Sequence, residues 1–140
     1  MTAAQPDDGV EIRLRPLVLL VEDNEDNQAI YQTILEHGGY DVLQAWDGEE
    51  GVRLARERLP AVILMDIAMP RINGWDATRL LRSDPATARI PVLALTAHVL
   101  PADRAMAEEI GYDGYLAKPI EPREVLAHVR RVVGTDAPPE

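Results

Sequence analysis

Short apolar runs and helical patterns alternate along the chain, and this alternation constrains the fold more than any other feature. Continuous apolar runs are typical of buried strands, whereas apolar residues three and four positions apart are typical of helices. The predicted strands are 17–21, 40–45, 61–65, 91–95 and 114–117, and the predicted helices are 24–37, 48–59, a segment after Gly74, 101–110 and 121–133. Strict alternation with short loops predicts an α/β fold, a doubly wound parallel sheet of five strands with helices on both faces.

The helical patterns also group side chains into rows along each predicted helix. In the first helix, Ile30 and Ile34 form one row beside a second row of Asn27, Tyr31 and Leu35. The later helices are predicted to turn inward Val52, Ala55 and Leu59, then Ala77, Leu80 and Leu81, and finally Val125, Leu126, Val129, Val132 and Val133.

The length of 140 residues predicts one domain. We expect it to span residues 16–133, between a flexible N-terminal extension, 1–15, and a loose C-terminal tail, 134–140. Within the extension, residues 10–14 alternate as an added edge strand would.

Charge and composition exclude several classes of function. Lys and Arg number 14 against 24 Asp and Glu, and the net charge of −10 opposes binding to a nucleic-acid backbone. The absence of Cys excludes disulfides, thiolate zinc sites and cysteine nucleophiles. No apolar stretch is long enough to span a membrane, so we expect a cytoplasmic protein with neither nucleic acid nor membrane as partner.

Polar residues follow the predicted strands where each strand ends. Glu22 and Asp23 follow the first, Asp66 the third, Thr96 the fourth and Lys118 the fifth. Because the carboxyl ends of parallel strands share one edge of the sheet, we expect these side chains to meet there. Three crowded carboxylates favour a divalent cation with oxygen ligands, and a nearby lysine and hydroxyl suit a phosphoryl group. A carboxylate is then the plausible nucleophile.

Four motifs at these strand ends resemble the signatures of the two-component response regulator receiver domain. They are Val21-Glu-Asp-Asn24, Met65-Asp-Ile-Ala-Met-Pro70, Leu95-Thr-Ala97 and Lys118-Pro119. They occur in the order and at the spacings of the family, and the resemblance covers about residues 16–133, nearly the whole chain. The resemblance implies a CheY-like receiver of the stand-alone, single-domain type. It also implies the flavodoxin-like (βα)5 fold with strand order 2-1-3-4-5.

The resemblance assigns roles residue by residue. Asp66 is similar to the phosphoacceptor; Asp23 to the direct Mg²⁺ ligand, with Mn²⁺ as an alternative metal; and Glu22 to a ligand acting through water. Further metal, phosphate-binding and switch positions are the backbone carbonyl of Ala68, then Thr96, Ala97, Lys118 and Tyr115, with a cis peptide bond at Pro119. Ala68 and His98 occupy positions that tune the lifetime of the phosphoryl group, and Ala68 cannot position an attacking water, so slow self-dephosphorylation is expected.

Parts of this pattern can also be interpreted in other ways, which differ in how well the residues suit them. Asn24, Glu25 and Asp26 also suit the cap and first turn of a helix. An aspartate-nucleophile phosphatase of the haloacid dehalogenase type would need a second acid two residues after the nucleophile, where this chain has Ala68. A degenerate receiver that serves only as a scaffold would lack reactive positions, which are all occupied here.

The preferred hypothesis is a phosphoacceptor switch. It would take a phosphoryl group from a histidine kinase or histidine phosphotransfer protein and catalyse only its own phosphorylation and dephosphorylation. We expect no attached effector domain, so output would pass through helix 101–110, strand 114–117 and helix 121–133 to a downstream protein or a second copy of the chain.

Overall fold

The computed structural model describes residues 15–69, 72–96 and 101–133, with side chains omitted at 101–103. Five strands and five helices alternate within these residues: β1 Leu17–Val21, α1 Glu25–His37, β2 Asp41–Ala45, α2 Gly48–Arg58, β3 Val62–Asp66, α3 Gly74–Ser83, β4 Val92–Thr96, α4 Pro101–Ile110, β5 Gly114–Ala117 and α5 Pro122–Val133. The predicted extension, its edge strand and the predicted tail lie outside the described residues, except Arg15.

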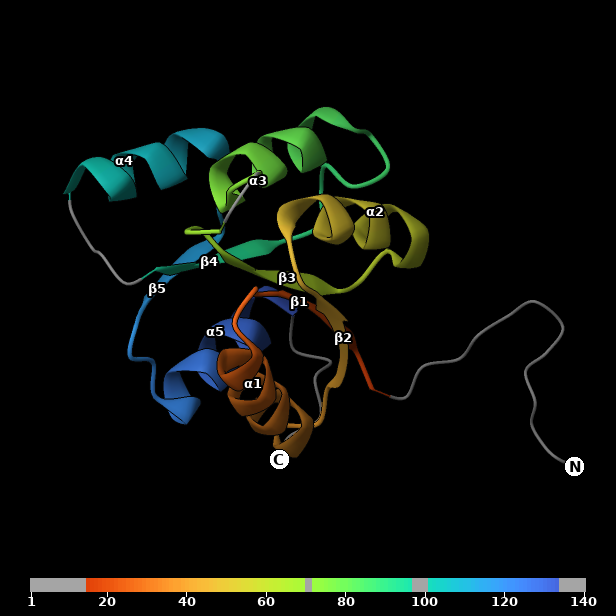
Figure 1. Cartoon of the computed structure of the whole chain (residues 1–140), viewed down its shortest axis with the longest axis vertical. Helices are drawn as coiled ribbons and strands as arrows, with labels where there is room; N and C mark the ends of the chain where they lie inside the picture. The colour runs from red at the N-terminus through yellow and green to blue at the C-terminus, as the bar shows by residue number, and fades with distance from the viewer. Residues whose placement is uncertain (1–14, 70–71, 97–100, 134–140) are drawn as a thin grey trace, which may run out of the picture.

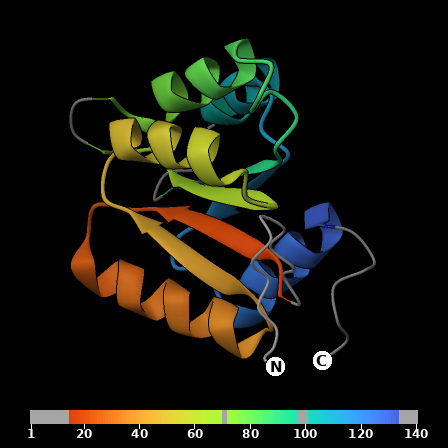
Figure 2. The same ribbon diagram turned by 90° about the vertical axis from the view of Figure 1, so that its right-hand side faces the viewer.

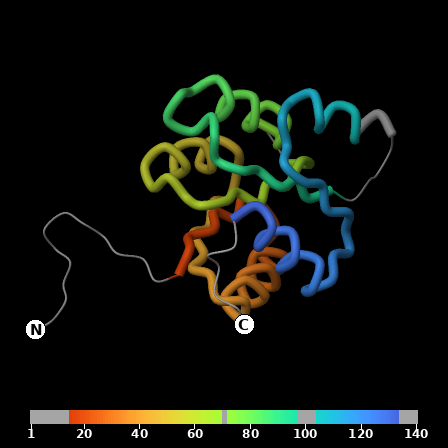
Figure 3. The backbone as a smooth tube through the Cα atoms, turned by 180° about the vertical axis from the view of Figure 1, so that it is seen from behind, coloured from red at the N-terminus to blue at the C-terminus, as the bar shows by residue number. Residues whose placement is uncertain are grey.

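All strands are parallel, in the order β2-β1-β3-β4-β5 (Figure 1). The predicted fold class and strand order are therefore confirmed. Helices α2, α3 and α4 cover one face of the sheet, and α1 and α5 cover the other, as Figure 2 shows in side view and Figure 3 from behind. With both faces covered, the inner strands bury every residue, which explains their unbroken apolar runs.

Alternate strand residues supply two separate cores. Val18 and Leu20 pack toward α1 and α5, whereas Leu19 and Val21 pack toward α2 and α3. This alternation follows from the period of two along a strand. The parallel pairing of the strands places the carboxyl ends of β1, β3, β4 and β5 side by side at one edge of the sheet.

Two apolar side chains that were predicted to face inward, Leu59 and Leu80, are exposed, at 58% and 42%. Ile30 of α1 is also exposed, at 54%. Leu59 is the C-cap of α2 and adopts a left-handed conformation, with φ of 46°. The helix ends there because Pro60 disfavours a helical residue before it. The prediction was wrong for Leu80 because Thr78 takes the inward position, where its hydroxyl donates to the hydroxyl of Tyr112.

In α1 the buried row is Gln28, Tyr31 and Leu35. Ile30 is exposed, whereas Ile34 is half-buried and packs against the core. Asn27 is only half-buried, and the polar Gln28 takes the innermost place at the start of the helix. Among the described residues, no helix has both the length and the apolar character needed to cross a membrane.

Candidate phosphoryl and metal site

Three carboxylates meet at the carboxyl edge of the sheet. One oxygen each from Glu22, Asp23 and Asp66 can be chosen so that all lie within 4.8 Å of one another. Asp66 is the last residue of β3, and Glu22 follows the last residue of β1, the neighbouring strand. Glu22 and Asp66 are 1% and 4% exposed, whereas Asp23 is exposed.

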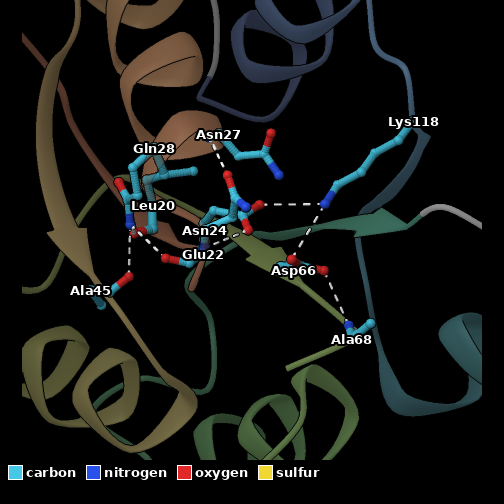
Figure 4. Close-up of polar contacts among 9 residues, drawn as sticks. All are labelled: Leu20, Glu22, Asn24, Asn27, Gln28, Ala45, Asp66, Ala68 and Lys118. Atoms are coloured by element: carbon cyan, nitrogen blue, oxygen red, sulfur yellow. Dashed lines mark hydrogen bonds and ion pairs between the residues drawn. The ribbon is translucent and has the colours of Figure 1, made fainter. Parts of the chain in front are cut away.

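Lys118 provides the positive charge of this pocket and is the only lysine in the sequence. Its Nζ lies 3.3 Å from Oδ2 of Asp66 and 3.4 Å from Oε1 of Glu22 (Figure 4). The Lys118 N–H also donates to the carbonyl of Thr96 at 2.7 Å, which joins the ends of β4 and β5. The Lys118–Pro119 peptide bond is cis, as the resemblance implies.

Backbone N–H groups hold the remaining carboxylate oxygens. Ala68 donates its N–H to Oδ1 of Asp66 at 3.1 Å, and Asn24 donates its N–H to Oε2 of Glu22 at 3.1 Å (Figure 4). Asn24 itself is the N-cap of α1, since its Oδ1 accepts the N–H of Asn27 at 2.9 Å. The cap interpretation of Asn24 is therefore confirmed, and Glu25 and Asp26 lie in the first turn.

The crowding of charge alters proton affinity in this pocket. Burial, and then repulsion from Asp66, raise the pKa of Glu22 from its ordinary value of 4.5 to about 7, against the opposing effect of Lys118. Burial alone would lower the pKa of Lys118, but the carboxylates of Asp66 and Glu22 outweigh it and raise that pKa. The charge of one lysine does not balance the three carboxylates, so the pocket keeps an excess of negative charge at neutral pH. The side-chain atoms that could bind a cation there are all carboxylate oxygens. This donor set fits a hard divalent cation.

The strand that ends at Asp66, β3, is held closely by the helix that follows it. A Cβ added to Gly74, the first residue of α3, would lie 2.6 Å from the carbonyl oxygen of Asp66 and 2.7 Å from Cα of Ile67. The N–H of Gly74 donates to the carbonyl of Ile67 at 3.0 Å. Only glycine allows this approach, which fixes the loop after Asp66 against α3.

The other predicted positions lie at different distances from the pocket. Thr96 is buried at the end of β4, opposite Ala117 of β5. Tyr115 is farther back on β5, opposite Ala94, and the guanidinium of Arg104 lies 5.7 Å from its ring centroid. Ala97 and His98 lie outside the described residues. Trp75 makes an edge-to-face contact with Tyr112, with 5.7 Å between the ring centroids.

Comparisons with known proteins agree with this geometry. The family model of the response regulator receiver domain matches residues 18–130. The chain belongs to this family.

Among relatives, the polar-differentiation response regulator DivK of Brucella anthropi is 34% identical over 117 residues, which are 84% of this chain and 95% of DivK. Among solved structures, the receiver domain of a sensor histidine kinase from Pseudomonas aeruginosa, with a magnesium ion coordinated in its active-site cleft, superposes with a TM-score of 0.80 at 37% identity, covering 86% of this chain and 99% of that one. Vibrio cholerae chemotaxis protein CheY4 superposes with a TM-score of 0.80 at 29% identity, covering 84% and 98%. The receiver described here is therefore a phosphoacceptor module of two-component signalling, with an acidic pocket that suits a divalent cation.

Proposed function

We propose that Asp66 of this receiver accepts a phosphoryl group from the phosphohistidine of a histidine kinase or histidine phosphotransfer protein. A carboxylate oxygen of Asp66 forms a bond to phosphorus while the bond from phosphorus to the imidazole nitrogen breaks. The electron pair of that bond stays on the imidazole, and the product is an acyl phosphate on Asp66. Apart from this step and the hydrolysis of the acyl phosphate, in which water takes the phosphoryl group and the Asp66 carboxylate is regenerated, we propose no catalysis.

The observation that supports Asp66 most strongly is its combination of burial and partners. Oδ1 is engaged by the N–H of Ala68, and Oδ2 lies 3.3 Å from Nζ of Lys118. A carboxylate held in this way presents a defined face to an incoming phosphorus atom, and the lysine is placed to bind the transferred oxygens. Glu22 is equally buried, but its pKa of about 7 leaves it partly protonated and a weaker nucleophile at neutral pH.

We propose Mg²⁺ as the natural metal, with Mn²⁺ as a substitute. Glu22, Asp23 and Asp66, together with the backbone carbonyl of Ala68, would hold it. When bound, Mg²⁺ supplies positive charge that offsets the charge of the phosphoryl oxygens. The residues of the chain keep the carboxylates together and exclude water from Glu22 and Asp66. Asp23, as the exposed member, is the accessible ligand for a cation that enters from solvent.

Output is proposed to pass through α4, β5 and α5. Phosphorylation would draw the hydroxyl of Thr96 toward the phosphoryl group and open space for the ring of Tyr115. Tyr115 lines a cavity of about 220 Å³ with Arg104, Glu108 and Tyr112, so a change of its ring position would alter a surface hollow. A downstream protein or a second copy of the chain would bind this face. We place the protein in the cytoplasm, where ATP sustains the kinases of such relays.

Slow loss of the phosphoryl group is also proposed. Ala68 lies two residues after Asp66, is exposed, and has a methyl side chain that cannot orient a water molecule for attack. His98, the other position expected to tune the lifetime, lies outside the described residues.

Acetyl phosphate with Mg²⁺, followed by intact mass analysis, tests the proposal. Wild type should gain a single phosphate, Asp66→Asn should gain none, and EDTA should prevent the gain. Asp76→Asn is the matched control, because Asp76 is an exposed aspartate on α3 paired with Arg79 outside the pocket. Equal phosphorylation of Asp66→Asn and wild type would refute the assignment. Profiling against purified histidine kinases would then identify the donor.

A further inference from the structure

Gln28 is a fully buried polar side chain beside the acidic pocket, on the inner face of the first turns of α1. It is 1% exposed, although a glutamine at this position of a helix would ordinarily remain in water. It contacts neither Asp66 nor Lys118 among the contacts drawn; Figure 4 shows it on the opposite side of Glu22 from both of them.

The amide of Gln28 gathers three backbone carbonyls at the ends of β1 and β2. Its Nε2 lies 2.8 Å from the oxygen of Ala45, 3.0 Å from that of Glu22 and 3.3 Å from that of Leu20 (Figure 4). Only the N–H side of an amide can face three carbonyl oxygens, so the orientation of the side chain is determined. Within the described residues, its Oε1 is buried and accepts no hydrogen bond. The side chain therefore acts as a donor alone.

These bonds fix the peptide that carries the acidic pair. The N–H of Glu22 donates to the carbonyl of Ala45 at 3.0 Å, and the carbonyl of Glu22 accepts from Gln28. Both backbone groups of Glu22 are thus tied to the same corner, and Asp23 continues directly from the tied carbonyl. Asp23 is exposed, so the placement of its carboxylate depends mainly on this backbone.

We propose that Gln28 is a positioning residue for the divalent cation: its amide holds the Glu22–Asp23 peptide so that both carboxylates converge with Asp66. The inference rests on the metal site of the proposed function. Groups that orient metal ligands are typically worth 10- to 100-fold in metal affinity. A purely structural role would instead affect folding and leave the affinity of the folded protein unchanged.

Gln32 provides a matched control on the same helix. It lies one turn after Gln28, is half-buried and joins α1 to β2, since its Oε1 accepts from Nε2 of Gln44 at 2.7 Å. Its contacts lie away from Glu22 and Asp23. Replacing either glutamine by methionine keeps an unbranched side chain of similar length and removes the amide.

The experiment measures Mg²⁺ dissociation constants by calorimetry for wild type, Gln28→Met and Gln32→Met, without a phosphodonor and well below each melting temperature. We expect Gln28→Met to raise the dissociation constant about tenfold and Gln32→Met to change it less than about twofold. Equal affinities of Gln28→Met and wild type would overturn the inference while leaving the metal site intact. A wild type that binds no Mg²⁺ would overturn both the inference and the metal part of the proposed function.

A second measurement covers the case in which Gln28→Met does not fold. In wild type labelled with ¹⁵N, the side-chain amide signals of Gln28 should shift on Mg²⁺ addition along the same titration curve as the backbone amide of Asp23. The side-chain signals of Gln32 should stay in place. Unmoved Gln28 signals at saturating Mg²⁺ would contradict the inference.

Discussion

Glu22→Gln should stabilise the metal-free receiver at alkaline pH, although it removes an ion-pair partner of Lys118. Glu22 is 1% exposed, and its pKa is raised from 4.5 to about 7 by burial and by Asp66. That difference corresponds to about 3 kcal/mol of unfolding free energy, which the folded protein loses when Glu22 ionises. Glutamine keeps the size and an accepting oxygen for the N–H of Asn24 but carries no charge.

The direction of the pH dependence follows from the raised pKa. The folded state holds the proton of Glu22 more tightly than the unfolded state does. The contribution of protonated Glu22 to the unfolding free energy is therefore fully present below pH 4.5 and is lost as pH rises through about 7. In EDTA, the unfolding free energy of wild type should therefore fall between pH 5 and pH 8 relative to that of Glu22→Gln. At pH 8 the variant should be more stable by up to about 3 kcal/mol, or roughly 10 °C in melting temperature.

Urea unfolding followed by circular dichroism at several pH values measures this difference. The two proteins share every ionisable group except Glu22, so the gap between the two curves isolates this residue. Glu57→Gln is the control, because Glu57 is an exposed residue of α2 paired with Arg53 and should leave the pH dependence unchanged. Parallel curves for wild type and Glu22→Gln, or a less stable variant at pH 8, would refute the raised pKa and the crowded pocket.

Three further predictions concern neighbouring residues. Asp23→Asn should stabilise the metal-free protein by less than about 1 kcal/mol, because Asp23 is exposed. Mg²⁺ at ten times its dissociation constant should raise the unfolding free energy of wild type by about 1.4 kcal/mol, and the variant should show little of this increase. A melting temperature of the variant below that of wild type in EDTA would show that Asp23 is mainly structural. Tyr112→Phe should lower the free energy of unfolding in urea by about 1–2 kcal/mol, because the Tyr112 hydroxyl donates to the Gly74 carbonyl at 2.7 Å and accepts from Thr78 at 2.8 Å. An unchanged urea midpoint would contradict this prediction. Gly74→Ala should lower the unfolding free energy by about 1–3 kcal/mol and slow phosphorylation by acetyl phosphate, because the added Cβ would meet the backbone of Asp66 and Ile67. Phosphorylation at the wild-type rate would show that this backbone tolerates displacement.

The sequence predicts the sheet well because its inner strands are apolar without interruption and are buried on both faces. Glu22, Asp23, Asp66 and Lys118 could be predicted to meet because each follows a strand of one parallel sheet, and the structure brings all four together. Their chemical roles come from the resemblance and remain proposals that the mass measurements test.

Helix faces were harder to predict, because a polar residue can take an inward position. Thr78 and Gln28 are both buried, and each donates a hydrogen bond to a partner that is distant in sequence and that a periodic pattern does not reveal. Leu80 was therefore assigned to an inward position incorrectly. A usable signal for Gln28 does exist, since it lies three residues before Tyr31 and seven before Leu35 on the buried row.

Mapping the phosphorylated residue tests the central claim most directly. Borohydride reduces an aspartyl phosphate to homoserine, and trypsin separates Asp66, in peptide 59–71, from Glu22 and Asp23 in an earlier peptide. After treatment with acetyl phosphate and Mg²⁺, homoserine should appear at position 66 alone and be absent when EDTA replaces Mg²⁺. Homoserine in the peptide of Asp23, or equal reduction at position 66 in EDTA, would contradict the assignment of Asp66 as the metal-dependent phosphoacceptor.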